Sequence, residues 1–410
     1  MRTMVGGAMF AHPDPMTSPR RPSLAPAPPV AAGRSVDALV DATPASRDRY
    51  VDLLRALSIV VVVLWHWMLS VTYLDHDGAI TMPNPVGDIR LMWLATWLLQ
   101  IMPVFFFVGG FANLATLDAM ERKGDGRWST FASKRLSRLL RPIGVFVAVW
   151  AAGDTLARVA LDDYESVLRW GIVVFVPLWF LGMYTAVVLL APLTARLHRR
   201  GRELTLVAMG VAIVLADLGR FRFGLEQLGL LNAALIWIFA HQLGYFWRDG
   251  TFTGWARRTL WTMALAGLTA LVVLTNLGVY PRSMVAVRGE AVSNMFPTTA
   301  CIAALAIFQM AVAMLLRPAA ERWLARRRNW KAVVSVNAVA MTVFTWHMTA
   351  LVAVLGLYRS LDFTLQTRPT AAWWWQRPLW LLAPGVILAG LVTLFARVEL
   401  PRRPDPTSPG

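Results

Sequence analysis

Long apolar stretches constrain this chain more than any other feature of its sequence. Several of them approach or exceed 18 residues, the length at which a helix spans about 30 Å of hydrocarbon. Charged residues make up 16% of the chain, against about 25% in a typical soluble domain. The alternation in segments of roughly ten residues that marks a transmembrane barrel is absent. The sequence therefore predicts an all-α polytopic membrane protein.

We predict about ten transmembrane helices with both termini in the cytoplasm. The predicted spans are 53–74, 91–113, 142–161, 171–194, 203–219, 227–247, 259–280, 295–316, 332–356 and 379–397. With this topology, the inner loops and the C-terminal end carry 23 Lys and Arg residues and the outer loops carry 10, as the positive-inside rule requires. The net charge of +16 is thereby explained without a nucleic-acid partner. We expect a multi-pass protein of the cytoplasmic membrane.

The two ends of the chain differ in composition from its centre. Residues 1–47 are rich in Pro, Ala, Ser and Arg and lack the apolar core of a signal peptide, so we expect a disordered cytoplasmic tail. Residues 48–397 would form the membrane domain, and 398–410 a second short cytoplasmic tail. Cys301 is the only cysteine, which excludes a disulfide framework and a cysteine-based metal cluster.

Three ionisable residues lie in the first span, within YVDLLRALSIVVVVLWHW (50–67). Arg55 and His66 are eleven residues apart, close to three helical turns, so they share one face and lie about 16 Å apart along the axis. Asp52 is one turn before Arg55 and can pair with it. Such groups need partners or a water-filled cavity within a membrane, so we expect this face to line a polar cleft open to the cytoplasm.

Each of these residues also has a purely structural interpretation. Asp52 and Arg55 would form an interfacial ion pair in which the arginine reaches the membrane surface. His66 would hydrogen-bond to a backbone carbonyl. The functional alternative for His66 is a general base, because a neutral imidazole at this depth is suited to proton transfer near pH 7.

Other candidate polar groups lie at the cytoplasmic end of the third span and near the middle of two spans. Arg135, Arg138 and Arg141 recur every three residues and would bind either lipid phosphate or the phosphates of a nucleotide-bearing substrate. Asp154 would either bond to another helix or orient His66 as the third member of a triad does. His347 lies at a similar depth to His66. We expect no metal site there, because no third ligand shares the spacing; a second polar group in the cleft fits better.

Four motifs in this order resemble those of the acyltransferase-3 family of integral membrane O-acyltransferases. They are Asp-x-x-Arg followed by ten residues and His in the first span (52–66), MPVFFFVGGF (102–111), RLSRLLRP (135–142) and PLWFLGMY (177–184). Together they cover most of residues 48–397, and the span count agrees with the family. One departure is Gly109, which stands where the family commonly has Ser, so a hydroxyl role is not carried to it. The adjacent Gly109 and Gly110 would still permit two helices to approach closely.

The resemblance implies transfer of a short acyl group, taken here as acetyl, from acyl-CoA to a hydroxyl group. The acceptor would be a carbohydrate, a glycolipid or a related small molecule of the cell envelope, and acyl-CoA would be a substrate rather than a permanently bound cofactor. His66 would act as the general base or carry the acyl group. Arg55, held by Asp52, would stabilise the oxyanion or bind CoA phosphate. Arg135, Arg138 and Arg141 would bind the nucleotide end of CoA.

A transporter is the main alternative from another class of protein. Arg55, His66 and Asp154 would then form a proton-coupled path, since intramembrane ionisable groups serve pumps as well as enzymes. Against it, no inverted repeat is visible and no pair of Gly/Pro-broken helices occupies matching positions. A binding scaffold without catalysis is a third interpretation, and it would leave His66 dispensable.

Overall fold

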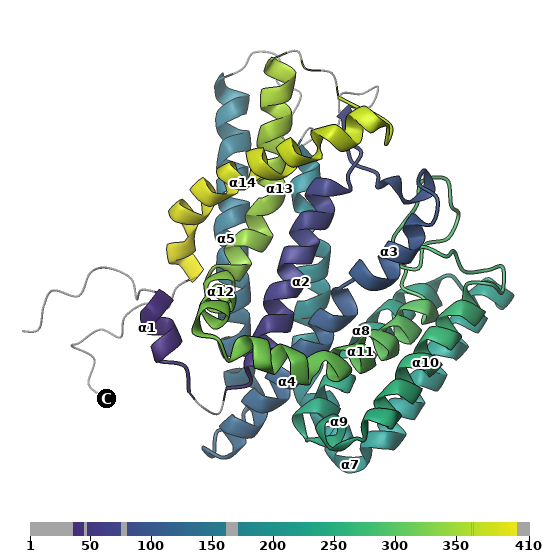
Figure 1. Ribbon diagram of the computed structural model, residues 1–410. Helices are drawn as coiled ribbons and strands as arrows, with labels where there is room; N and C mark the ends of the chain where they lie inside the picture. Colours follow the sequence, from purple (N-terminus) through teal and green to yellow (C-terminus); the bar gives the residue numbers. More distant parts are fainter. Residues whose placement is uncertain are drawn as a thin grey trace, which may run out of the picture.

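The computed structural model describes residues 36–44, 47–74, 80–160, 171–361, 363 and 365–399. In these ranges the chain is almost entirely helical, and the long helices form a bundle (Figure 1). The long helices are α2 (Arg49–Met68), α4 (Met102–Glu121), α5 (Trp128–Ala160), α7 (Leu178–Phe223), α8 (Gln227–Arg248), α10 (Arg257–Leu274), α11 (Ala300–Leu324), α13 (Ala340–Ser360) and α14 (Ala371–Glu399). The short elements are α1 (Val36–Asp41), β1 (Tyr73–Leu74), β2 (Ile80–Thr81), η1 (Pro85–Gly87), α3 (Met92–Leu99), η2 (Ile172–Phe175), α9 (Thr251–Gly254) and α12 (Arg327–Ala338).

Within the described ranges, nine helical segments are long and apolar enough to cross a membrane. The difference from ten predicted spans lies in one segment of 52 residues, Ile172–Phe223, which contains α7. The backbone leaves the helical conformation at Gly201, with φ −171° and ψ 76°. The fourth and fifth predicted spans, 171–194 and 203–219, fall on either side of this break.

Both halves of α7 pack alongside α8, so the chain folds back at Gly201. In the first half, the ring of Trp179 lies 6.4 Å from that of Trp237 on α8. In the second half, the carbonyl oxygen of Ile213 accepts a hydrogen bond from Asn232 of α8 at 3.2 Å. The bundle therefore agrees with the predicted all-α polytopic class of about ten spans.

A break in the second predicted span, 91–113, separates α3 from α4. The carbonyl groups at the end of a helix have no partner inside it, and here a side chain of α11 supplies one. The amide nitrogen of Gln309 donates to the carbonyl oxygens of Trp97 at 3.1 Å and Gln100 at 3.0 Å. Pro103, in the first turn of α4, occupies a position where its missing N–H costs nothing. The break is thus stabilised within the bundle.

Helices α4 and α8 make an unusually close contact at two glycines. A Cβ atom at Gly110 would overlap the carbonyl oxygen of His241, and one at Gly244 would overlap that of Phe107. Only glycine permits this approach of the two backbones. The role predicted for the Gly109-Gly110 pair in helix packing is therefore confirmed at Gly110.

The predicted boundary of the N-terminal tail is wrong for residues 36–41. These residues form α1, which packs on α12 rather than remaining disordered. Val40 is buried in a cluster with Trp330 of α12, and the carboxylate of Asp37 lies 2.7 Å from the ammonium of Lys331. A short apolar face and acidic residues opposite a basic helix are enough to fix this turn. Residues 1–35 and 400–410, the remainder of the two predicted tails, lie outside the described residues.

Candidate active site

Two histidines from distant parts of the chain meet in the centre of the bundle. His66 of α2 and His347 of α13 have ring planes 22° apart and centroids separated by 5.1 Å. Nδ1 of His66 lies 3.0 Å from Nε2 of His347. Trp67 donates to the carbonyl oxygen of His347 at 3.0 Å, which ties the two helices together beside the rings. The similar depth predicted for these histidines is confirmed.

Hydrogen bonding fixes where the protons of this pair lie. Nδ1 of His347 is 2.7 Å from the carbonyl oxygen of Phe344, and because a carbonyl only accepts, this nitrogen carries the proton. In a neutral imidazole the other nitrogen is then an acceptor. Nε2 of His347 therefore accepts from Nδ1–H of His66. It follows that Nε2 of His66 keeps its lone pair, as a general base requires.

His66 lies in the wall of a cavity of about 520 Å³. The cavity is lined by α2, by the α3–α4 break, by η2 and the start of α7, and by the loop before α11. Its walls are mainly apolar, with aromatic rings such as Trp65 and Phe344 and few polar side chains. A cavity of this size, apolar with a few polar groups, is typical of a small-molecule site.

The cavity lies at the other end of α2 from Asp52 and Arg55. Its lining includes Asn84 and Val285 but neither Asp52 nor Arg55. The expected polar cleft, open to the cytoplasm and shared by Arg55 and His66, is therefore not what surrounds His66. Helical periodicity put the two residues on one face correctly. It could not show that the free space begins only at the His66 end.

Asp52 and Arg55 form the predicted ion pair, within a larger cluster. Arg55 lies 2.7 Å from the carboxylate of Asp52, and Arg47 binds both oxygens of the same carboxylate. Asn337, in the last turns of α12, accepts from Arg55 at 2.7 Å and donates to the carbonyl of Asp52 at 2.8 Å. Sequence reasoning missed Asn337, although a lone amide in the apolar stretch 332–356 was a signal. Arg55 is about 16 Å from His66 along the helix, so the structure does not bring it to the imidazole.

The three arginines predicted to bind an anion, all in the first half of α5, have different surroundings. Arg135 donates to the carbonyl oxygen of Ala112 and to the hydroxyl of Thr116, both on α4. Arg138 and Arg141 are exposed. Arg135 thus holds α4 against α5, while the other two guanidinium groups are accessible to an anion.

Tyr184 of α7 fills the space next to Gly109. A Cβ atom at Gly109 would lie 2.9 Å from the ring edge of Tyr184 and 3.0 Å from its hydroxyl oxygen. The tyrosine hydroxyl therefore occupies the region that a serine side chain at position 109 would enter. Sequence reasoning did not single out Tyr184, because nothing in the sequence relates it to Gly109.

A row of aromatic rings runs from Tyr184 to the histidine pair. The ring of Tyr184 lies 5.9 Å from that of Phe180, and Phe180 lies 5.4 Å from Phe344. Phe344 is in turn 5.9 Å from the ring of His347. Phe180 and Phe344 also line the cavity. We call these rings, which lead from Tyr184 to His347, the aromatic row.

Asp154 has a different partner from the one considered for it. Its carboxylate lies 2.9 Å from the guanidinium of Arg158, one turn further along α5. The position beside His66 that a triad carboxylate would take is occupied by His347. Within the described ranges, no group of three or more His, Cys, Asp and Glu side chains suited to a metal ion occurs.

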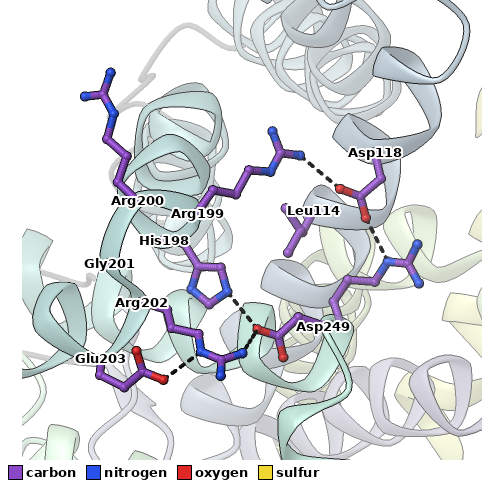
Figure 2. Close-up of a pocket in the computed structure, with 10 residues that line it drawn as sticks. Leu114, Asp118, His198, Arg199, Arg200, Gly201, Arg202, Glu203 and Asp249 are labelled. Carbon is purple, nitrogen blue, oxygen red and sulfur yellow. Dashed lines mark hydrogen bonds and ion pairs between the residues drawn. The ribbon is translucent and has the colours of Figure 1, made fainter.

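A second cavity, of about 480 Å³, lies at the fold-back of α7 (Figure 2). It is polar, and its charged side chains other than Arg200 form ion pairs. Arg199 binds Asp118 of α4 at 2.9 Å, and Arg202 binds Asp249 at 3.2 Å. Burial alone would raise the pKa of Asp249. Hydrogen bonds from Thr251 and His198 outweigh this effect, so the pKa lies below its usual value. These ion pairs hold the turn at Gly201 against α4 and α8.

Fold and site together define a polytopic membrane protein with a histidine dyad at an internal small-molecule cavity. The acyltransferase-3 family model, described as an acyltransferase domain, matches residues 48–397. The chain belongs to this family, and the resemblance predicted from its motifs is confirmed. No curated protein and no solved structure matches the chain.

Proposed function

We propose that this protein moves a short acyl group, acetyl, from acyl-CoA to a hydroxyl group of a carbohydrate, a glycolipid or a related acceptor in the cytoplasmic membrane. Its family supports an acyltransferase in general. The observation that carries the proposal is the orientation of the dyad. Nε2 of His347 accepts a hydrogen bond from Nδ1–H of His66. The basic nitrogen of His66, Nε2, is therefore left free in a cavity wall.

The reaction requires one general base and a site that positions the acceptor hydroxyl. Nε2 of His66 removes the hydroxyl proton while the oxygen attacks the thioester carbonyl. The tetrahedral intermediate then collapses, the carbon–sulfur bond breaks, and the CoA thiolate leaves and takes up the proton from the imidazolium. His347 stabilises that imidazolium through the hydrogen bond at Nδ1. Alternatively, Nε2 itself attacks the thioester, the carbon–sulfur bond breaks, and CoA leaves as the thiolate. The alcohol oxygen then attacks the acyl-imidazole, the carbon–nitrogen bond breaks, and the alcohol proton passes to the thiolate.

The donor would approach from the opposite end of the bundle. Arg138 and Arg141 are exposed there and match phosphate geometry, so we assign them to the nucleotide end of CoA. Arg55 and Asp52 lie too far along α2 to act on the reacting atoms, so we assign Arg55 to CoA phosphate rather than to the oxyanion. The acyl arm must then pass the aromatic row to reach His66.

The test uses the protein in lipid nanodiscs with acetyl-CoA labelled on the acetyl group. Release of free CoA and transfer of label to a membrane and glycan extract are followed for the wild type and for His66→Ala. We expect CoA release and transfer to depend on His66. A wild-type protein that neither releases CoA nor transfers label to any extract would contradict the proposal, and flux measurements on the same variants would then test the transporter alternative.

The two routes through His66 are separated by a quench. If the acyl group rests on the imidazole, acid quenching in the absence of acceptor leaves label on the peptide that contains His66. If His66 acts as a base, the label stays on CoA until acceptor is added. Arg138→Gln should raise the KM for acetyl-CoA and leave kcat almost unchanged, because the assigned contact is lost equally in the ground and transition states.

A further inference from the structure

The cavity at His66 is unlike a site for a highly hydroxylated or charged molecule. Among the described residues that line it, none is Asp, Glu, Lys or Arg. Its polar side chains are largely engaged with the protein itself. Asn84 donates to the carbonyl of Ala286 at 2.7 Å, and Ser70 donates to the carbonyl of His66 at 2.6 Å. A ligand group without a hydrogen-bond partner costs about 1–3 kcal/mol on burial, so this wall favours an acceptor with an apolar body.

Gln100 illustrates the same point at the α3–α4 break. Its amide nitrogen donates to the carbonyl oxygen of Met284 at 3.3 Å, and its carbonyl oxygen accepts from the backbone of Met102 at 3.4 Å. Around it the cavity is lined by the flexible apolar side chains of Met82, Met295 and Met348. Methionines adapt to varied apolar shapes. Nε2 of His66 keeps its lone pair on a residue of this wall and can therefore accept a hydrogen bond from a hydroxyl group.

One side of the cavity is formed by side chains that are also exposed on the outside of the bundle. Leu99, at the end of α3, is 40% exposed, and Trp179, at the start of α7, is also 40% exposed. Ile172 and Val176, between them in the wall, are 62% and 50% exposed. In a membrane protein, exposed apolar side chains on a spanning segment face lipid. The cavity thus borders the bilayer between α3 and the η2–α7 junction.

We propose that the acceptor is an uncharged, largely apolar alcohol dissolved in the membrane, and that it enters sideways between Leu99 and Val176 to place its hydroxyl at His66. This rests on the proposed acyl transfer and replaces its carbohydrate acceptor by an apolar alcohol. The volume of about 520 Å³ admits a molecule of drug-like size or the end of a longer lipid. A soluble sugar would lose its hydration here without gaining enough hydrogen bonds to replace it.

The test measures binding separately from catalysis. Nanodiscs containing the wild-type protein are irradiated with a diazirine-bearing long-chain alcohol, with the corresponding diazirine carboxylic acid, or with a water-soluble diazirine glucoside. Labelled peptides are identified by mass spectrometry. We expect the alcohol to label peptides containing Leu99 or Val176 at least tenfold more than the other two probes, and unlabelled alcohol to compete.

Two matched variants localise the entrance. Val176→Trp places a large ring at the entrance and should lower labelling of the Leu99 peptide by at least tenfold. Val211→Trp makes the same change on the lipid-facing side of α7, at a valine that is 52% exposed and does not line the cavity, and should leave labelling unchanged. Both positions are exposed, so neither substitution disturbs the core. Equal labelling in both variants would overturn the sideways entrance.

The outcomes separate this inference from the proposed function. In the first outcome, the alcohol labels the cavity, no acetyl group is transferred to it, and no acceptor leads to CoA release. This result supports the apolar binding site and contradicts the proposed acyltransferase activity. Acetyl transfer to the soluble glucoside, with no cavity labelling by the alcohol, keeps the acyltransferase and overturns the inference. Labelling together with acetyl transfer to the alcohol supports both.

Discussion

Two histidines of this bundle differ in what their ring nitrogens contact. His66 bonds to His347 and lies in a cavity wall, whereas His241 is fully buried where α4 and α8 are closest. The amide nitrogen of Asn113 lies 2.9 Å from Nε2 of His241 and donates to it. The lone pair of Nε2 of His241 is therefore used in a hydrogen bond between α4 and α8, whereas the lone pair of Nε2 of His66 remains free in the cavity wall. Burial of a histidine says little about catalysis; the direction of its free nitrogen says more.

The largest effect should come from removing the imidazole in the cavity wall. His66→Ala should lower kcat by about 10²–10⁴-fold, the usual contribution of a general base, with an apparent melting temperature close to that of the wild type. CoA release by the purified variant, with melting followed by fluorescence, measures both. A variant that melts normally and retains more than a tenth of the activity would contradict the central role of His66.

The close contact between α4 and α8 near His241 should affect stability rather than catalysis. In an exposed helix, Gly→Ala is normally stabilising by about 1 kcal/mol. Gly244→Ala should instead destabilise by about 1–3 kcal/mol or more, because the added methyl overlaps the carbonyl of Phe107. Gly210→Ala is the matched control, since nothing lies within 4 Å of its Cβ position. Opposite shifts in melting temperature are expected, and shifts of the same sign would refute the contact.

The partner of His66 should have an intermediate effect. His347→Ala removes the acceptor that holds the proton on Nδ1 of His66, and we expect kcat to fall about tenfold, or roughly 1.4 kcal/mol. His347→Gln offers an amide oxygen as a replacement acceptor and should recover most of the activity. Equal losses in the two variants would show that His347 only fills space.

The smallest effect should be at Asp154. Its buried carboxylate lies 2.9 Å from the guanidinium of Arg158, whose side chain is 56% exposed. Asp154→Asn should leave CoA release within twofold of the wild type, because neither Asp154 nor Arg158 lines the cavity at His66. A loss comparable to that of His347→Ala would instead restore Asp154 as a group that acts on the dyad.

The features that could be predicted from the sequence are those set by the regular geometry of a helix. The Asp52–Arg55 pair and the common depth of His66 and His347 follow from helical rise and periodicity, and both are seen in the structure. What depends on how helices rotate and tilt against each other was not predictable, because packing sets those angles. The contact of Asn337 with Arg55 and the position of Tyr184 beside Gly109 belong to this second kind. The Asp154–Arg158 pair does not, because the two residues are one turn apart in α5.

The side on which the cavity opens was missed for a related reason. Apolar hydropathy marks 91–113 as one span and gives no sign that the chain breaks between Leu99 and Met102. The break depends on Gln309, some 200 residues further along, which supplies hydrogen bonds to the broken end. A local pattern cannot report so distant a partner.

The aromatic row also bears on the electrical integrity of the membrane. An elementary charge crossing a bilayer at 100 mV releases about 2.3 kcal/mol, so a continuous file of water and ionisable groups through this bundle would leak protons. Phe180 and Phe344 interrupt any such file between Tyr184 and the histidine pair. Their rings can neither donate nor accept a proton. Along this row, therefore, no proton passes between Tyr184 and His347.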